Sequence, residues 1–199
     1  MKPSIRANGL ATICLLFAAC GAEHPVHYYT INYPATAASA MNAEGVVLLV
    51  GRIAAPEGLE DSRIRYRSGS NEVGAYEYHR WSERPATMVR DLLIQKLRAS
   101  GKFRQVQESS SAAAGGYLIR GKLFDFSEID RPGMLTRVSL QLDLLDRKTG
   151  LVLWDRQYNR DEPVNGHAMN DVVSSLDHNL QQVIADSASD IESFLSNRK

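Results

Sequence analysis

The sequence predicts a single α/β domain in which amphipathic helices pack against a mixed β-sheet. Val46–Val50 is continuously apolar, which is typical of a strand that is covered on both faces. Thr136–Asp146 instead alternates apolar and polar side chains, as expected for a strand with one covered face. Two further segments, 85–101 and 169–195, carry apolar residues at the three- and four-residue spacing of amphipathic helices.

The first half of the chain predicts a strand, a hairpin and a helix. Val26–Tyr33 is aromatic and strand-like. Arg63–Arg67 and Glu72–Trp81 flank a Ser-Gly-Ser-Asn turn, a pattern that favours a β-hairpin. Pro85 suits the first turn of a helix, and the Ser-Gly pair at 100–101 suits its end. The apolar stripe of this helix consists of Met88, Val89, Leu92, Leu93 and Leu97.

The second half predicts more strands and a long final helix. Strands are expected at Phe103–Val106, Tyr117–Phe126, Thr136–Asp146 and Leu151–Tyr158. The Arg-Lys-Thr-Gly turn at 147–150 makes the last two antiparallel. A helix that begins near Asn170 should lie across the sheet and supply much of the core. Its stripe consists of Met169, Val172, Val173, Leu176, Leu180, Val183, Ile184, Ile191 and Leu195.

The N-terminus is organised like a bacterial lipoprotein signal that ends at Cys20. Lys2 and Arg6 precede an apolar stretch of about ten residues, too short for a bilayer that needs about 20. The two small alanines before Cys20 suit a signal peptidase, and the cysteine thiol is the group that accepts diacylglycerol in lipoprotein maturation. We therefore expect a signal peptide at 1–19, a lipidated tether at 20–25 and the folded domain at 26–199. An ordinary secretory leader with a chance cysteine is the alternative interpretation.

Composition narrows the possible ligands. The chain has 23 basic and 23 acidic residues, and removal of the leader leaves a slight acidic excess. Nucleic-acid binding normally needs a basic excess, so no nucleic-acid partner is predicted. The only other cysteine, Cys14, lies in the leader, which excludes a disulfide and a cysteine-based metal site in the mature chain.

The sequence carries no motif for an enzyme. Its histidines, at 24, 27, 79, 167 and 178, form no metal-ligand spacing, and neither a nucleophile elbow nor a phosphate-binding glycine loop is present. We therefore expect neither catalysis nor a cofactor or metal. A hydrolase without a recognisable motif is the least favoured interpretation.

The hairpin provides the best candidate interaction site. Arg63 and Arg65 alternate along one strand, and Tyr76, Tyr78 and Arg80 alternate along the other. Tyrosine, tryptophan and arginine are enriched at interface hot spots, so these five residues are expected to contact a second subunit or a partner protein. The alternative is structural: Trp81 and one tyrosine anchor the core, and the arginines pair with glutamates 72, 77 and 83.

A lipid-binding opening is a separate hypothesis. Phe124, Phe126 and Met134 lie near the Pro-Gly pair at 132–133 and could line an apolar entrance. Ordinary closure of the core explains such a pattern more simply.

The ordered combination of these segments resembles the ABC-type transport auxiliary lipoproteins, which include the lipoprotein of the paraquat-inducible Pqi system. It comprises the lipidation site, the early Tyr28-Tyr29 strand, the aromatic hairpin with its helix, and the Thr149-Gly150-x-x-x-Trp154 pattern. The resemblance implies an α/β sandwich similar to anticodon-binding-like folds. It also implies an outer-membrane lipoprotein that faces the periplasm and self-associates. Its implied partners are MCE-domain proteins and the associated ABC or Pqi-type membrane components of lipid transport. A lipoprotein that regulates or assembles cell-wall enzymes is the alternative.

Overall fold

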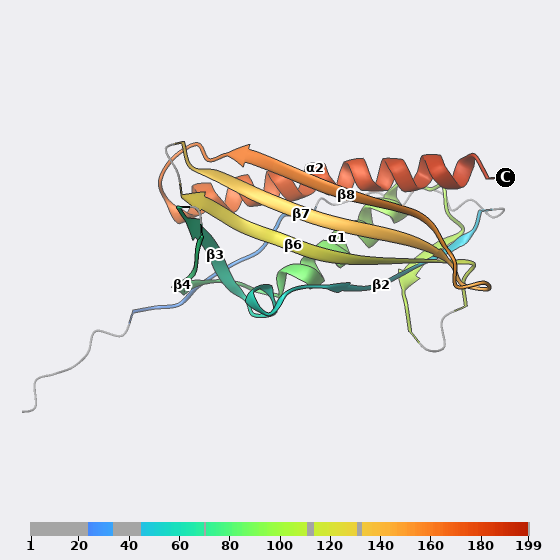
Figure 1. Cartoon of the computed structure of the whole chain (residues 1–199), viewed down its shortest axis with the longest axis horizontal. Coiled ribbons are helices and arrows are strands. Elements are labelled where there is room, and N and C mark those ends of the chain that lie inside the picture. The colour runs from blue at the N-terminus through green and yellow to red at the C-terminus, as the bar shows by residue number, and fades with distance from the viewer. Residues whose placement is uncertain (1–23, 34–44, 70, 111–113, 131–132, 199) are drawn as a thin grey trace, which may run out of the picture.

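The computed structural model describes residues 24–33, 45–69, 71–110, 114–130 and 133–198 (Figure 1). Over these residues it shows one mixed sheet and two α-helices, α1 (Pro85–Ala99) and α2 (Met169–Ser196), with a short 3-10 turn, η1, at Glu57–Leu59. The strands are β1 (His27–Tyr29), β2 (Val47–Ala54), β3 (Arg63–Ser68), β4 (Glu72–Trp81), β5 (Gln105–Glu108), β6 (Tyr117–Asp130), β7 (Leu135–Asp146) and β8 (Val152–Pro163).

The long strand β6 organises the sheet. On one edge its first half pairs in parallel with β2, and its second half pairs in parallel with β3. On its other edge β6 pairs antiparallel with β7, which pairs antiparallel with β8. The sheet then extends from β3 to β4 and β1, and from β2 to β5. The predicted α/β class, the single domain and the mixed sheet are confirmed.

Most predicted elements occur at their predicted places. Strand β4 and helix α1 begin at the predicted residues, and the 147–150 turn makes β7 and β8 antiparallel, as expected. Strand β1 covers only three residues of the aromatic segment 26–33. In contrast, β6 and β8 each continue beyond their predicted ends. The leader, Cys20 and the segment 34–44 lie outside the described residues.

Both helices lie on the same face of the sheet, behind it in Figure 1. The predicted stripe of α1 is fully buried there, and the α2 residues at its centre, such as Leu176 and Leu180, have no exposed surface. They meet the apolar side chains of β7, whose polar residues 137, 141 and 143 lie on the opposite face. No helix in the described part of the chain is both long enough and apolar enough to span a bilayer.

Two observations complete the core. Trp81 is 1% exposed and packs on Phe126 with ring centroids 5.3 Å apart, so it anchors the core as its alternative interpretation predicted. Strand β2 is buried on both faces, as expected. On the face away from the helices, β2 is covered by the chain itself. Leu49 is buried there outside the main apolar cluster, close to Gly115 in the segment before β6.

Replacement of Trp81 by alanine should destabilise the domain by about 3 kcal/mol or more, because a large buried side chain would leave a cavity. Urea unfolding followed by circular dichroism measures this change. Val73, which is 55% exposed, gives the control Val73→Ala, with an expected change within about 0.5 kcal/mol. Equal losses in the two variants would contradict this assignment of the core.

Candidate docking surface

The β3–β4 hairpin places its arginines and its central tyrosines on opposite faces of the sheet. Arg65 pairs with Ala75, whereas Tyr66 pairs with Gly74. Because paired residues share a face and successive residues alternate, Tyr76 lies on the side of Tyr66 and away from Arg65. The five residues predicted as one interface therefore do not form a single surface.

An irregularity in β4 separates the predicted row of tyrosines further. Arg63 pairs with Arg80 while Arg65 pairs with Ala75, so β4 uses more residues than β3 over this stretch. Such a bulge breaks the alternation on which the face prediction relied. As a result, the ring of Tyr76 packs against Tyr66 and His79, at centroid distances of 5.1 and 5.9 Å. The ring of Tyr78 meets His24 instead, at 5.1 Å.

Tyr76 belongs to a buried polar contact on the helix side of the sheet. Its hydroxyl donates to Oε2 of Glu128 at 2.8 Å, and Glu128 is only 2% exposed. Burial raises the pKa of Glu128, while the hydrogen bond from Tyr76 opposes that increase. Burial and the neighbouring carboxylate also raise the pKa of Tyr76. The hydroxyl of Tyr76 is thus engaged within the domain.

The arginines of β3 lie on the face opposite the helices and pair with aspartates. Arg63 and Arg65 both contact Oδ2 of Asp61, at 2.6 and 3.1 Å. Arg67 contacts Asp125 at 2.9 Å. Burial raises the pKa of Asp61, but hydrogen bonds from Arg63 and the charge of Arg65 outweigh it and lower the pKa overall. The structure thus gives these arginines aspartate partners, where glutamates 72, 77 and 83 were considered.

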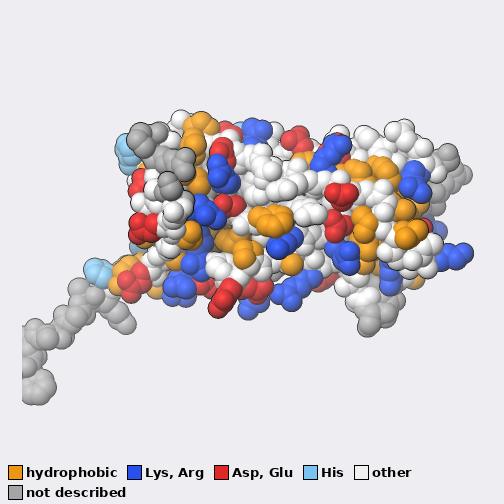
Figure 2. Space-filling view, viewed as in Figure 1, with side chains coloured by type: hydrophobic (Ala, Val, Ile, Leu, Met, Phe, Trp, Pro, Cys, Tyr) orange, Lys and Arg blue, Asp and Glu red, His pale blue; other side chains and the backbone are white. Residues whose placement is uncertain are grey.

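We call this helix-free side of the sheet the open face. It contains a shallow hollow of about 590 Å³. The residues that line the hollow are Arg67, Phe124, Asp125, Arg137, Ser139, Asn159 and Asp161. Arg137 donates two hydrogen bonds of 2.7 Å to the carboxylate of Asp161. Cationic and anionic side chains therefore alternate along the hollow. Charged side chains of both signs are spread over this side of the molecule, with separate hydrophobic side chains between them (Figure 2).

The open face includes residues that sequence reasoning assigned elsewhere. A register shift near 123–125 places Phe126 in the core, whereas Phe124 lines the hollow beneath the ammonium group of Lys122, 4.8 Å from its ring. Met134 packs against the core cluster. The three residues therefore do not line a common opening, and the hypothesis of a lipid entrance there is wrong. The pairing of Arg137 with Asp161 required the register between β7 and β8, which the sequence did not supply.

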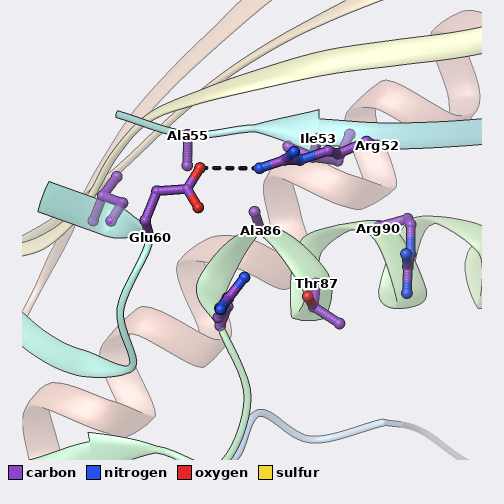
Figure 3. A pocket seen from close by; sticks show the side chains of 9 residues that line it. Arg52, Ile53, Ala55, Glu60, Ala86, Thr87 and Arg90 are labelled. Atoms are coloured by element: carbon purple, nitrogen blue, oxygen red, sulfur yellow. Dashed lines mark hydrogen bonds and ion pairs between the residues drawn. The ribbon is translucent and has the colours of Figure 1, made fainter. Parts of the chain in front are cut away.

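A second hollow, of about 230 Å³, lies between the end of β2, η1 and the first turn of α1 (Figure 3). Arg52 faces the carboxylate of Glu60 across it, at 3.1 Å. Arg90, which also lines it, pairs with Asp91 and Glu108 at 2.8 and 2.6 Å. Ion pairs therefore engage Arg52 and Arg90, and Arg84 adds a further cation to the lining.

Three histidines, at 27, 79 and 178, make local contacts within the domain. Nδ1 of His79 lies 2.8 Å from the hydroxyl of Tyr29, and the ring of His27 stacks on His79 at 5.4 Å. Burial and the nearby His27 lower the pKa of His79. His178 lies 3.1 Å from Glu162. Within the ranges that the structure describes, no three histidine, cysteine, aspartate or glutamate side chains are grouped so that they could hold a metal ion.

Comparison with known proteins identifies relatives of this chain. Residues 29–188 match the family described as ABC-type transport auxiliary lipoprotein component. A comparison with functionally curated proteins gave no match.

Solved structures show the same fold. Protein XCC0632 from Xanthomonas campestris is 18% identical, with a TM-score of 0.76, and the match covers 87% of this chain and all of that one. An uncharacterized protein is 17% identical with a TM-score of 0.68 over 84% and 99% of the two chains. The hypothetical protein CT253 from Chlamydia trachomatis is 9% identical with a TM-score of 0.52 over 75% and 97%. At these identities the likeness establishes the fold alone.

The buried carboxyl of Glu128 predicts a pH-dependent contribution to stability. Because its pKa is raised in the folded state, its stabilising effect is present below the unfolded pKa of about 4.5 and is lost as the pH rises through the folded pKa. Glu128→Gln keeps an oxygen that can accept from Tyr76 but removes the charge. We therefore expect the free energy of unfolding of the variant, measured relative to wild type, to be higher at pH 7 than at pH 4.5. Urea unfolding of both proteins at the two pH values measures this difference. An identical difference in free energy at the two pH values would contradict it.

Proposed function

Because this chain belongs to the family of ABC-type transport auxiliary lipoprotein components, we propose that it is the docking subunit of a lipid transporter, anchored in the outer membrane and facing the periplasm. Its proposed partners are MCE-domain proteins, which would carry phospholipid across the periplasm, and the ABC or Pqi-type membrane components associated with them. Membership of the family makes the chain a lipoprotein of the cell envelope that assists an ABC-type transporter. The location in the outer membrane and the transport of lipid are our proposals.

The anchor is proposed to be Cys20. The signal peptide 1–19 would be removed, and acyl chains on Cys20 would hold the domain through the tether 20–25. Two or more chains give stable attachment, whereas one gives only marginal binding. Gly21, which is not an aspartate, follows the cysteine and supports export to the outer membrane over retention at the inner one.

The observation that carries the docking role is the open face of the sheet. Both helices cover the other face, so a whole layer of side chains on β3, β6, β7 and β8 faces outward. That layer is a mosaic of arginine–aspartate pairs around Phe124 and a broad hollow, which suits a protein partner with complementary charges better than a reacting small molecule. Arg63, Arg65 and Arg80 remain the proposed contacts on the hairpin.

Attachment to the membrane would strengthen such a contact. A domain held at the bilayer meets a transporter at high effective concentration, which can raise avidity by roughly 10²–10⁴ without new contacts. We also propose that the lipoprotein self-associates, because β8 offers an edge that no other described strand pairs with. Several copies would multiply the docking contacts.

Lipidation can be tested in the intact cell. Wild-type protein should incorporate radiolabelled palmitate and fractionate with the outer membrane, whereas Cys20→Ser should lose both the label and the membrane. The protein's abundance, measured by immunoblot, controls for degradation of the variant. A Cys20→Ser protein that still fractionated with the outer membrane would remove the basis of the anchor.

Docking can be tested by affinity purification from crosslinked envelopes. The double variant Arg63→Ala/Arg65→Ala should capture at least about tenfold less MCE-domain protein. Arginine is enriched among interface hot spots, whose truncation costs about 2 kcal/mol or more, and about 1.4 kcal/mol corresponds to a factor of ten. Arg156→Ala is the matched control. Arg156 also holds an aspartate at 2.6 Å and is similarly exposed, but it contacts Asp190 of α2 at the other edge of the sheet.

Two outcomes would count against this docking role. Unchanged capture by the double variant would remove the hairpin arginines from the interface. Recovery of cell-wall synthases in place of MCE-domain proteins would favour the role of a regulator or assembly factor for cell-wall enzymes.

A further inference from the structure

We infer that the edge of the sheet formed by β1 and the adjoining part of β4 rests on the bilayer in which the lipoprotein is anchored, with Val26, Tyr28 and Tyr78 at the membrane–water interface. We call these three residues the membrane edge. The inference deepens the proposed function and rests on its lipid anchor at Cys20. It assigns the region around Tyr78 to lipid, although the sequence suggested a protein contact there.

Covalent geometry places this edge close to the membrane. A fully extended chain spans at most about 3.6 Å per residue, so His24 cannot lie more than about 14 Å from Cys20. The described structure begins at His24 and reaches β1 only three residues later. The segment that carries β1 lies at the β3–β4 end of the molecule, and the C-terminus of α2 and the β7–β8 turn lie at the opposite end (Figure 1).

The edge is fixed to the domain and cannot swing away freely. Strand β1 pairs in parallel with β4, with His27 beside His79 and Tyr29 beside Trp81. The stacked rings of His27 and His79 and the hydrogen bond between Tyr29 and His79 reinforce this pairing. The ring of His24 meets Tyr78 edge-on, at 5.1 Å. The start of the described chain is therefore held against this edge of the sheet.

The chemistry of the edge suits a bilayer interface. Tyr28 is 66% exposed, the largest fraction among the exposed large hydrophobic side chains in the described part of the chain, and Val26 is also exposed. Tyrosine combines an apolar ring with a polar hydroxyl and is enriched where membrane meets water. On a soluble surface such side chains would have to remain in contact with water, whereas the interface accommodates both of their ends.

The surrounding charges favour a neutral lipid surface. Tyr28 lies beside Arg80 of the neighbouring strand, and Arg80 lies opposite Arg63 of β3. Asp61 forms an ion pair with Arg63. Burial and the nearby carboxylate of Glu77 raise the pKa of Tyr78. With positive and negative groups both present, the edge has no strong attraction to anionic lipid. The proposed contact is therefore with zwitterionic headgroups, through the aromatic rings of Tyr28 and Tyr78.

The mature chain allows a direct test because acylated Cys20 has no free thiol and no other cysteine remains after cleavage of the leader. Full-length lipoprotein carrying Tyr28→Cys would be spin-labelled and reconstituted in vesicles of phosphatidylcholine and phosphatidylethanolamine. Leu151→Cys is the matched control. Leu151 is 63% exposed, close to the 66% of Tyr28, but lies in the β7–β8 turn at the far end of the domain.

The accessibility of the label at position 28 to a water-soluble nickel chelate should be at most about one third of that at position 151, since hydrocarbon excludes charged solutes. Its accessibility to oxygen should be higher than at position 151. Val26→Cys should behave like Tyr28→Cys and guards against a fault specific to one variant. Equal access of the chelate to positions 28 and 151 in vesicle-bound protein would overturn the inference.

Vesicle flotation separates this result from a failure of the proposed function. If the labelled proteins float with the vesicles but position 28 remains open to the chelate, the lipid anchor stands and the membrane edge is wrong. If the wild-type lipoprotein does not float, the anchor itself is wrong, and the inference falls with it. Capture of MCE-domain protein through Arg63 and Arg65 is measured independently of either result.

Discussion

Burial of one face of the sheet by α1 and α2 is the constraint on which the rest of this structure depends. The helices and the inward side chains of β6 and β7 form one continuous apolar cluster. Because side chains alternate along each strand, covering one face automatically presents a second set of side chains on the other. The arginine–aspartate mosaic of the open face is therefore a consequence of the same strands that build the core.

The domain thereby separates two tasks in space. The apolar core and the buried contact between Tyr76 and Glu128 lie on the helix side of the sheet. The open face, with its broad hollow, remains available to a partner. The β1 edge is the part of the domain that covalent geometry brings closest to the proposed anchor. A lipoprotein arranged in this way can hold to a bilayer at one end and still present a large polar surface to proteins of the periplasm.

Irregularities of pairing decide which residues share these surfaces. In β4 a register shift turns Tyr76 toward Glu128 and Tyr78 toward His24, although both were expected in one row. In β6 a shift near 123–125 sends Phe126 into the core and leaves Phe124 on the open face. A single extra residue reverses the face of every side chain after it, so periodicity in the sequence cannot locate such a change.

The sequence by itself determined the fold class, the positions of nearly all strands and both helices, the apolar stripes of the helices and, through the ordered motifs, the family. These features follow from local periodicity and capping, which residues such as Leu176, Pro85 and Trp81 specify directly. Tertiary structure alone decided that Asp61 and Asp125 hold the hairpin arginines, that Tyr76 is engaged inside, and that the open face contains a hollow. Those outcomes depend on pairing between β3, β6, β7 and β8, and the register of strands distant in the sequence is fixed only when the whole sheet packs against its helices.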